Sequence, residues 1–113
     1  PDGLTDCDFC QPRDEERIDN IAGACAACGL LELAKLTKGD ESSRYHAAAL
    51  QLLKALHELC ADYTDHSTGI LQKCTAAYHN DGAGRHVNIL YGDYFYVEAL
   101  CKLMGTDAGL WTE

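Results

Sequence analysis

The sharpest spacing of reactive side chains in this sequence is found among its cysteines. Cys7 and Cys10 are three residues apart, and so are Cys25 and Cys28. Four-cysteine zinc sites use such pairs, because two thiolates at this spacing fill two corners of a tetrahedron. The second pair lies in an Ala- and Leu-rich run that favours a helix, where cysteines are small core residues. A zinc-stabilised domain is therefore an alternative, and buried reduced thiols are the favoured interpretation.

Other catalytic patterns are weaker still. A cysteine nucleophile needs electropositive surroundings, and only Cys74 and Cys101 have a lysine as neighbour. The run from Gly82 to Gly84 lacks the Lys-Ser ending of a phosphate-binding loop. The five histidines show no paired ligand spacing. We expect no cofactor.

A third group of residues combines aromatic rings with hydrogen-bonding side chains between positions 78 and 94. Rings stack on the apolar face of a sugar, while amide, carboxylate and imidazole groups bind its hydroxyls. A nearby helix N-terminus also favours an anionic group such as a uronate or a sulfate. Packing of the tyrosines near a helix end is the competing explanation. The candidate contacts are Tyr78, His79, Arg85, His86, Asn88, Tyr91 and Asp93.

Charge and length limit the possible partners. The chain has 113 residues, of which 9 are Lys or Arg and 18 are Asp or Glu, so its formal charge is −9. Nucleic acids and anionic membranes repel such a chain, and the longest apolar stretch, 21–31, is too short to span a bilayer. The odd number of cysteines, 7, and the lack of a cationic leader predict a cytoplasmic protein with reduced thiols.

The elements that must position these residues are predicted to be helices. Asp19 is a suitable N-cap for a helix over 20–36, and Gly39 suits a left-handed stop after it. This helix is apolar on all sides, which is typical of a buried helix, and its many alanines let neighbours approach closely.

Two further helices follow. Ser42 or Ser43 is expected to cap an amphipathic helix over 44–61, and Asp93 is expected to cap a helix over 94–104 that Gly105 ends. The long segments between them carry loop signals. The pattern predicts an all-α fold without a significant sheet.

Two stretches of the chain resemble glycoside hydrolase family 88, the unsaturated glucuronyl hydrolases. Residues 19–33 resemble the family's DTSAAAIAASGLLEL helix, and residues 89–100 are similar to its (I/L)(W/Y)GDYYFLEAL motif. Shorter matches lie at 69–71 and 78–79, where the family reads GLL and YH, and at 7–9, where it reads WDF. The chain departs from the family at Ile21, where serine is usual, and at Cys7, where tryptophan is usual.

The resemblance implies a fold and a reaction. The family forms an (α/α)6 toroid of six helical hairpins, and the chain resembles its C-terminal portion only. These enzymes release a 4,5-unsaturated uronic acid from lyase-generated oligosaccharides by protonating the vinyl ether and adding water, with a pair of aspartates. The implied segments are a loop over 1–18, an inner helix over 19–38, an outer helix over 43–62, substrate-side loops over 63–92 and an inner helix over 93–104.

The resemblance also implies which residues face the sugar. The family's aspartates belong to upstream motifs, so no catalytic residue is assigned to this chain. Tyr78 is the first candidate for a substrate contact and His79 the second, while Arg85, His86 and Asn88 can reach the next sugar or its sulfate. The implied partner is an unsaturated uronic-acid oligosaccharide, bound once the upstream hairpins complete the pocket.

A second hypothesis is a non-catalytic helical binding or assembly module. The apolar helix over 20–36 cannot be fully covered by two other helices, and an open apolar surface usually marks an interface. We therefore expect self-association of the isolated chain, or marginal stability without the missing N-terminal hairpins.

Overall fold

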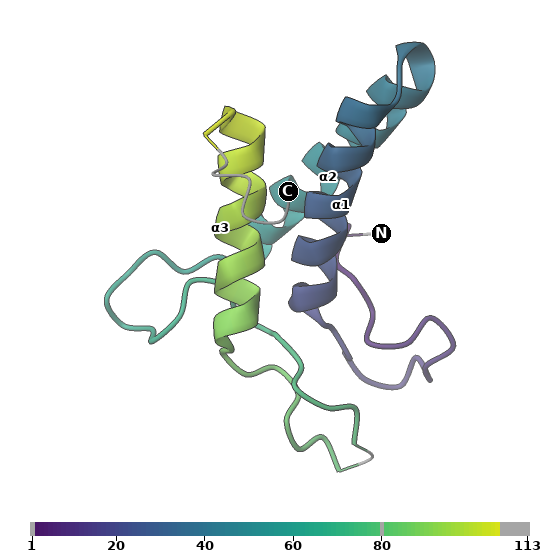
Figure 1. Ribbon diagram of the computed structural model, residues 1–113. Coiled ribbons are helices and arrows are strands. Elements are labelled where there is room, and N and C mark those ends of the chain that lie inside the picture. The colour runs from purple at the N-terminus through teal and green to yellow at the C-terminus, as the bar shows by residue number, and fades with distance from the viewer. Residues whose placement is uncertain (1, 80, 107–113) are drawn as a thin grey trace.

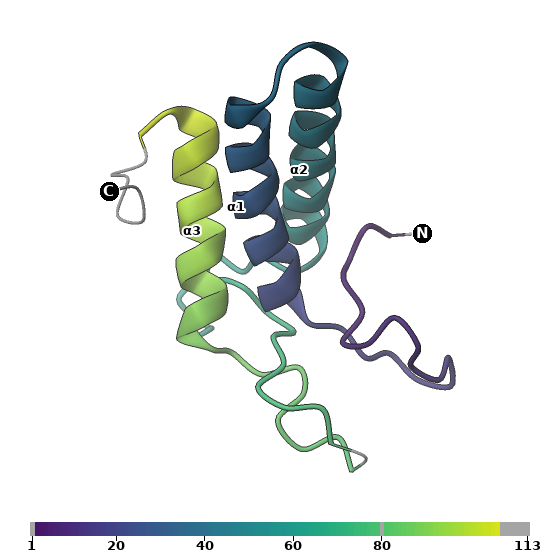
Figure 2. The ribbon, with the colours of Figure 1, turned by 45° about the vertical axis from the view of Figure 1, so that its right-hand side comes forward.

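The computed structural model describes residues 2–79 and 81–106, and these residues form three helices. The helices are α1 (Asn20–Leu36), α2 (Gly39–Leu59) and α3 (Leu90–Met104). Figure 2 shows α1 between α2 and α3, and α1 and α3 run in the same direction (Figure 1). Strand-like pairing in the described residues is limited to isolated bridges. The predicted all-α fold is confirmed.

α1 is the central helix because its small side chains admit a neighbour on each side. The predicted N-cap is confirmed, since the Asp19 carboxylate accepts a hydrogen bond from the backbone N–H of Ile21 at 3.0 Å. Ala24 and Ala27 are completely buried, and Leu31 is nearly so. Alanines at these positions let the backbones of adjacent helices come close, which fixes α2 and α3 on opposite flanks of α1.

The start of α2 differs from the prediction. The helix begins at Gly39 rather than at residue 44, and it ends at Leu59. Ser42 does not cap it: its hydroxyl donates to the backbone carbonyl of Ala34 in α1 at 2.6 Å. Gly39 has the expected left-handed conformation, with φ of 63°, yet α1 is already capped by Thr37. The glycine therefore opens α2 instead of stopping α1.

The start of α3 also differs. The helix begins at Leu90, four residues before the predicted start at 94, and its N-cap, Ile89, makes no side-chain hydrogen bond. Asp93 therefore lies inside the first turn and does not cap the helix. The end is as predicted, because Gly105 adopts the left-handed conformation with φ of 71°.

The helices are joined by an apolar core and by an ion pair. Tyr96, Leu56 and Leu71 are among the largest fully buried side chains of the core. Towards the other end, the Lys102 ammonium of α3 lies 2.8 Å from the Glu32 carboxylate of α1. The ammonium groups of Lys102 and Lys35 lower the pKa of Glu32. In the part of the chain that the structure describes, no helix is both long and apolar enough to cross a membrane.

Gly92 marks the closest approach of α3 to the segment before it. A Cβ atom at this position would collide with the Sγ atom of Cys74 and would lie 3.5 Å from Leu71. Both partners are completely buried, so neither has room to move. Gly29 of α1 is the opposite case, because a Cβ atom there would meet nothing within 4 Å.

The two glycines make a matched pair of substitutions. We expect Gly92→Ala to lower the free energy of unfolding by about 1–3 kcal/mol, through overpacking of a filled core. Gly29→Ala should raise it by about 0.5–1 kcal/mol, because alanine restricts the unfolded chain and favours the helix. Urea denaturation followed by circular dichroism measures both. Equal effects of the two changes would contradict the packing at Gly92.

Candidate functional site

Two loops cover the end of the molecule where α1 and α3 begin. The N-terminal loop (residues 2–18) leads into α1, and residues 60–89 connect α2 to α3. Both loops lie at the same end of the helices (Figure 1, Figure 2). We call residues 69–75 the central segment and the described residues 76–79 and 81–88 the Tyr78 loop. The sugar contacts predicted from the sequence lie in this region.

The central segment is held from one side by Asp93 of α3. One carboxylate oxygen of Asp93 accepts the backbone N–H groups of Ile70 at 2.9 Å and Leu71 at 2.7 Å. Gly69 lies against the same carboxylate, since a Cβ atom there would be 3.1 Å from its second oxygen. The acid predicted as a helix cap is therefore an anchor between elements, which is why α3 begins without a side-chain cap.

α1 holds the central segment from the other side. Asn20, which is completely buried, donates from its side-chain amide to the backbone carbonyl of Gln72 at 2.7 Å. Its own backbone N–H bonds the carbonyl of Lys73 at 3.3 Å. The cap residue Asp19 also accepts from the backbone N–H of Thr75 at 3.1 Å. The first residues of α1 thus satisfy polar groups of a segment more than 50 positions away in the sequence.

The Tyr78 loop is built around the side chain of Arg85. Its side chain is only 9% exposed, and its guanidinium lies 5.9 Å from the centre of the Tyr78 ring. On another side, a Cβ atom at Gly82 would lie 2.9 Å from the Nη2 atom of Arg85. The Nη1 atom bonds the carboxylate of Glu15 at 3.0 Å. A cation over a tyrosine ring is attracted by the negative face of the ring.

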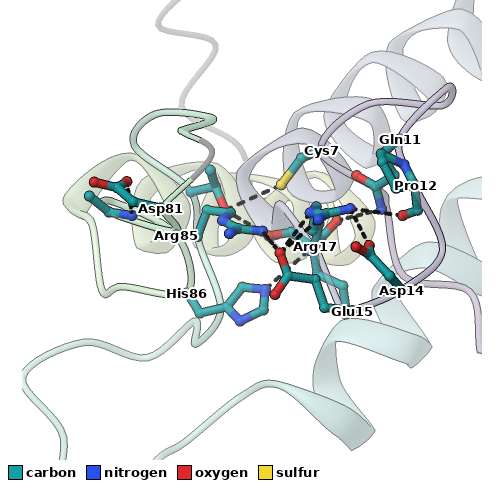
Figure 3. A network of polar contacts seen from close by, with 12 residues as sticks. Cys7, Gln11, Pro12, Asp14, Glu15, Arg17, Asp81, Arg85 and His86 are labelled. Atoms are coloured by element: carbon teal, nitrogen blue, oxygen red, sulfur yellow. Dashed lines mark hydrogen bonds and ion pairs between the residues drawn. The ribbon is translucent and has the colours of Figure 1, made fainter.

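Glu15 links Arg85 to a second arginine of the N-terminal loop (Figure 3). The Arg17 Nη2 atom lies 2.7 Å from the same Glu15 oxygen that Arg85 contacts, and its Nη1 atom lies 2.8 Å from Asp14. Arg17 also donates to the carbonyl of Pro12 at 2.9 Å. Hydrogen bonds from Arg85 and then Arg17 lower the pKa of Glu15, so this carboxyl is firmly ionised at neutral pH.

His86 ties the two loops together. Its Nε2 atom accepts the backbone N–H of Ile18 at 3.1 Å, so the lone pair of this nitrogen is engaged by the N-terminal loop. The residue has φ of 52°, a left-handed conformation that side-chain-bearing residues rarely adopt. Thr75 adds a second tie, because its hydroxyl donates to the Ile18 carbonyl at 2.7 Å and accepts from the Cys7 thiol at 3.4 Å.

The structure separates the predicted sugar contacts into two kinds. Tyr78 is 43% exposed and Tyr91 is 66% exposed, and His79 is also exposed. Arg85, His86 and Asp93 are instead occupied by the protein's own groups, and Asn88 donates to the Ser67 hydroxyl at 3.0 Å. Tyr78 and Arg85 are brought into direct contact, whereas Tyr91 lies on α3. The role of each residue towards a ligand remains a prediction.

The cysteines do not form the zinc site that was the alternative. In residues 2–79 and 81–106, no three His, Cys, Asp or Glu side chains are grouped so that they could hold a metal ion. Cys25 and Cys28 lie within α1, where the Cys28 thiol donates to the Phe95 carbonyl at 3.2 Å. The seven cysteines all lie in the described residues, and no disulfide bond joins them. Burial raises the pKa of the Cys74 thiol to about 11, as expected for a cysteine packed as a core residue.

Sequence patterns did not reveal the residues that support the Tyr78 loop. Glu15 and Arg17 belong to a charged run that reads as a solvated surface loop, and Thr75 stands in no motif. The run of three acids between two arginines over 13–17 was the available signal. It shows that ion pairs can form but not that one partner comes from a position 70 residues later.

Comparison with solved structures shows which class of fold the chain has. No family model matches the chain. Among solved structures, unsaturated glucuronyl hydrolase from Bacillus sp. GL1 superposes with a TM-score of 0.81 and 33% identity, over 90% of this chain and 28% of that one. A structure of the enzyme from Streptococcus agalactiae shares the fold, with a TM-score of 0.79 at 24% identity. The chain has the fold of a segment of an α/α toroid.

The sequence comparison identifies the particular relative. The chain is 34% identical to the unsaturated glucuronyl hydrolase of Bacillus sp. (strain GL1) over 117 aligned positions, which cover 99% of the chain and 30% of the relative. A further similar structure, with a TM-score of 0.81 and 32% identity, is an unsaturated glucuronyl hydrolase variant with the oligosaccharide dGlcA-Glc-Rha-Glc. The resemblance to this family of hydrolases is confirmed, over a chain that spans less than a third of the relative's length.

The anchor at Asp93 gives a direct test of this geometry. We expect Asp93→Ala to lower the free energy of unfolding by about 1.5–3 kcal/mol, because two backbone N–H groups lose a charged acceptor. Amide exchange at Ile70 and Leu71 should accelerate most, as measured by NMR. Asp65→Ala, at an exposed position of the same connection, serves as the control. Unchanged exchange at the two amides would show that Asp93 is not their acceptor.

Proposed function

We propose that this chain forms one wall of the sugar pocket of an unsaturated glucuronyl hydrolase. In this proposal the complete protein releases a 4,5-unsaturated uronic acid from oligosaccharides left by polysaccharide lyases. The observation that carries it is the similarity over 99% of the chain to a hydrolase of this type. The relative with a bound oligosaccharide supports a saccharide as the ligand.

The exposed ring of Tyr78 supports a place in the pocket wall. It stands on the loop beside the N-terminal ends of α1 and α3, and Arg85 holds it from behind. A fixed aromatic ring can stack on the apolar face of a sugar without losing much conformational freedom. His79 follows it and adds a group that can bind a hydroxyl. These two residues are the proposed primary contacts.

We propose that the remaining predicted residues shape the pocket and do not supply a free charge to the sugar. Arg85 is neutralised by Glu15, and Asn88 and Asp93 are occupied by Ser67 and the central segment. The negative charge of a uronate would therefore be met by the amide ends of α1 and α3 and by exposed imidazoles. These groups would act against an acidic background, because the two loops at this end contain nine Asp and Glu residues and four Lys and Arg residues.

The chemistry of the proposed reaction is assigned to residues outside this chain. Hydration of a vinyl ether requires a carboxyl group that first donates a proton to the double bond and then accepts one from water. The two carboxylates that contact the central segment and the Tyr78 loop are already committed, Asp93 to two amides and Glu15 to two guanidinium groups. We assign no catalytic residue here and propose that the catalytic aspartates lie in upstream hairpins.

The helices fit the proposed layering of a toroid. α1 and α3 are parallel and begin at the loop end (Figure 1), as inner helices that line a shared pocket would. α2 is antiparallel to them and has a polar outer face, with Lys54 and Glu58 forming an exposed ion pair at 3.9 Å. We propose that α1 and α3 are inner helices and α2 is an outer helix.

A binding or assembly module is the second candidate, and the surface of α3 favours it. Leu90, Val97 and Met104 are exposed at intervals of seven residues, which places them on one stripe of the helix. Such a stripe fits either the missing hairpins of a longer protein or another copy of this chain. The two functions are compatible when the chain is completed.

Sugar binding and turnover can be measured separately on the 113-residue chain. We expect an unsaturated chondroitin disaccharide to perturb the NMR signals of Tyr78 and His79, with no loss of the ultraviolet absorbance of its double bond. Tyr78→Ala should weaken binding by about three- to tenfold, as loss of one stacked ring does. Tyr45→Ala, on α2 and distant from the loops, should not. Turnover by the chain alone would overturn the assignment of the catalytic pair to other hairpins.

The exposed stripe on α3 predicts association of the isolated chain. Sedimentation velocity should show oligomers whose share grows with concentration, and Val97→Glu should shift them to monomer by placing a charge in the apolar contact. Leu36→Glu, at an exposed position of α1, is the control. It should leave the oligomers unchanged if association uses α3 specifically. A monomer at all concentrations would contradict this prediction.

A further inference from the structure

We propose that Glu15 is a positioning residue for Tyr78 and acts through Arg85. Glu15 belongs to the N-terminal loop and is not one of the predicted sugar contacts. The inference rests on the proposed function, because it concerns the placement of the ring that would stack on the sugar. This inference makes the N-terminal loop, which precedes α1, part of the structure that positions the proposed sugar contact.

The Tyr78 loop depends on Arg85 because it has no apolar interior of its own. Ala76 is exposed and the alanine after it is only half-buried. The loop is closed by the backbone bonds from Ala76 to Gly84 at 2.7 Å and from Arg85 to Gly82 at 3.2 Å. The guanidinium fills the space that these turns enclose, with the ring of Tyr78 on one side.

A guanidinium in this position requires a counter-charge. Arg85 has 9% of its side chain exposed, and its Nε atom is buried without a hydrogen-bond partner. Within the described residues, the one acid paired with Arg85 is Glu15. Burying a charge is costly unless it is paired, so removing Glu15 would favour conformations in which Arg85 moves towards water and leaves the Tyr78 ring.

A variant of the neighbouring acid, Asp14, distinguishes the loss of the Glu15–Arg85 pair from the loss of one negative charge. Asp14 stands one position earlier and carries the same charge, but it pairs with Arg17 and not with Arg85. The bond from Arg17 to the Pro12 carbonyl involves neither acid. Asp14→Asn and Glu15→Gln therefore change the net charge equally and differ in whether Arg85 loses its partner.

The experiment compares these two variants of the 113-residue chain by NMR. For Glu15→Gln we expect amide exchange at Ala76 and Arg85 to rise by about two- to fivefold, the effect of losing a partly exposed ion pair. The ring signals of Tyr78 should shift as the cation leaves the ring. Asp14→Asn should leave both readouts as in the unchanged chain. The double variant Glu15→Gln with Arg85→Gln should show no faster exchange than Arg85→Gln alone.

A titration with the unsaturated disaccharide gives the functional readout. Its affinity should fall about two- to fivefold in Glu15→Gln and stay constant in Asp14→Asn. Unchanged Tyr78 ring signals and exchange in Glu15→Gln would overturn the positioning role. If the unchanged chain shows no response to the disaccharide, the proposed function fails, while the ring signals and exchange rates still decide whether Glu15 positions Tyr78.

Discussion

The arrangement of this end of the molecule depends on how the central segment satisfies its backbone polar groups. Residues 69–75 run between the starts of α1 and α3 without forming a strand or helix, so their N–H and C=O groups need partners elsewhere. Asp93 supplies an acceptor from α3, while Asn20 and Asp19 supply a donor and an acceptor from α1. The two helices are thereby fixed relative to each other, and the Tyr78 loop starts from a defined position.

Ion pairs join the two loops at this end of the molecule where apolar packing does not reach. Glu15 is shared by Arg85 and Arg17, and Lys73 makes a second link between the loops through Glu16 at 2.9 Å. Single exposed ion pairs contribute little, but a network with a nearly buried guanidinium restricts the loop more strongly. These ion pairs hold the loop that presents the exposed Tyr78 ring, because Glu15 links that loop to the N-terminal loop.

The similarity to unsaturated glucuronyl hydrolases gives these contacts a context. The chain spans about 30% of its curated relative, and the small residues of α1 accept α2 and α3 while other helix faces remain open. Exposed apolar residues on α3, such as Leu90 and Val97, fit a helix that has a further neighbour in a larger assembly. The isolated chain therefore has a well-defined loop end and an incomplete helix surface.

The sequence by itself determined that three helices form, because apolar periodicity is a local property, and Asp19 caps α1 and Gly105 ends α3 as predicted. The predicted starts of α2 and α3 were wrong, because the polar side chains expected to cap them have partners in other segments. The motif matches also indicated the hydrolases to which the chain is similar. Only the tertiary structure decided that Ser42 bonds α1, that Asp93 anchors a distant segment, and that Cys25 and Cys28 do not join Cys7 and Cys10. The partner of a polar side chain depends on which segments the fold brings together. Glu15 and Arg85 are 70 positions apart, so no local pattern could reveal their contact.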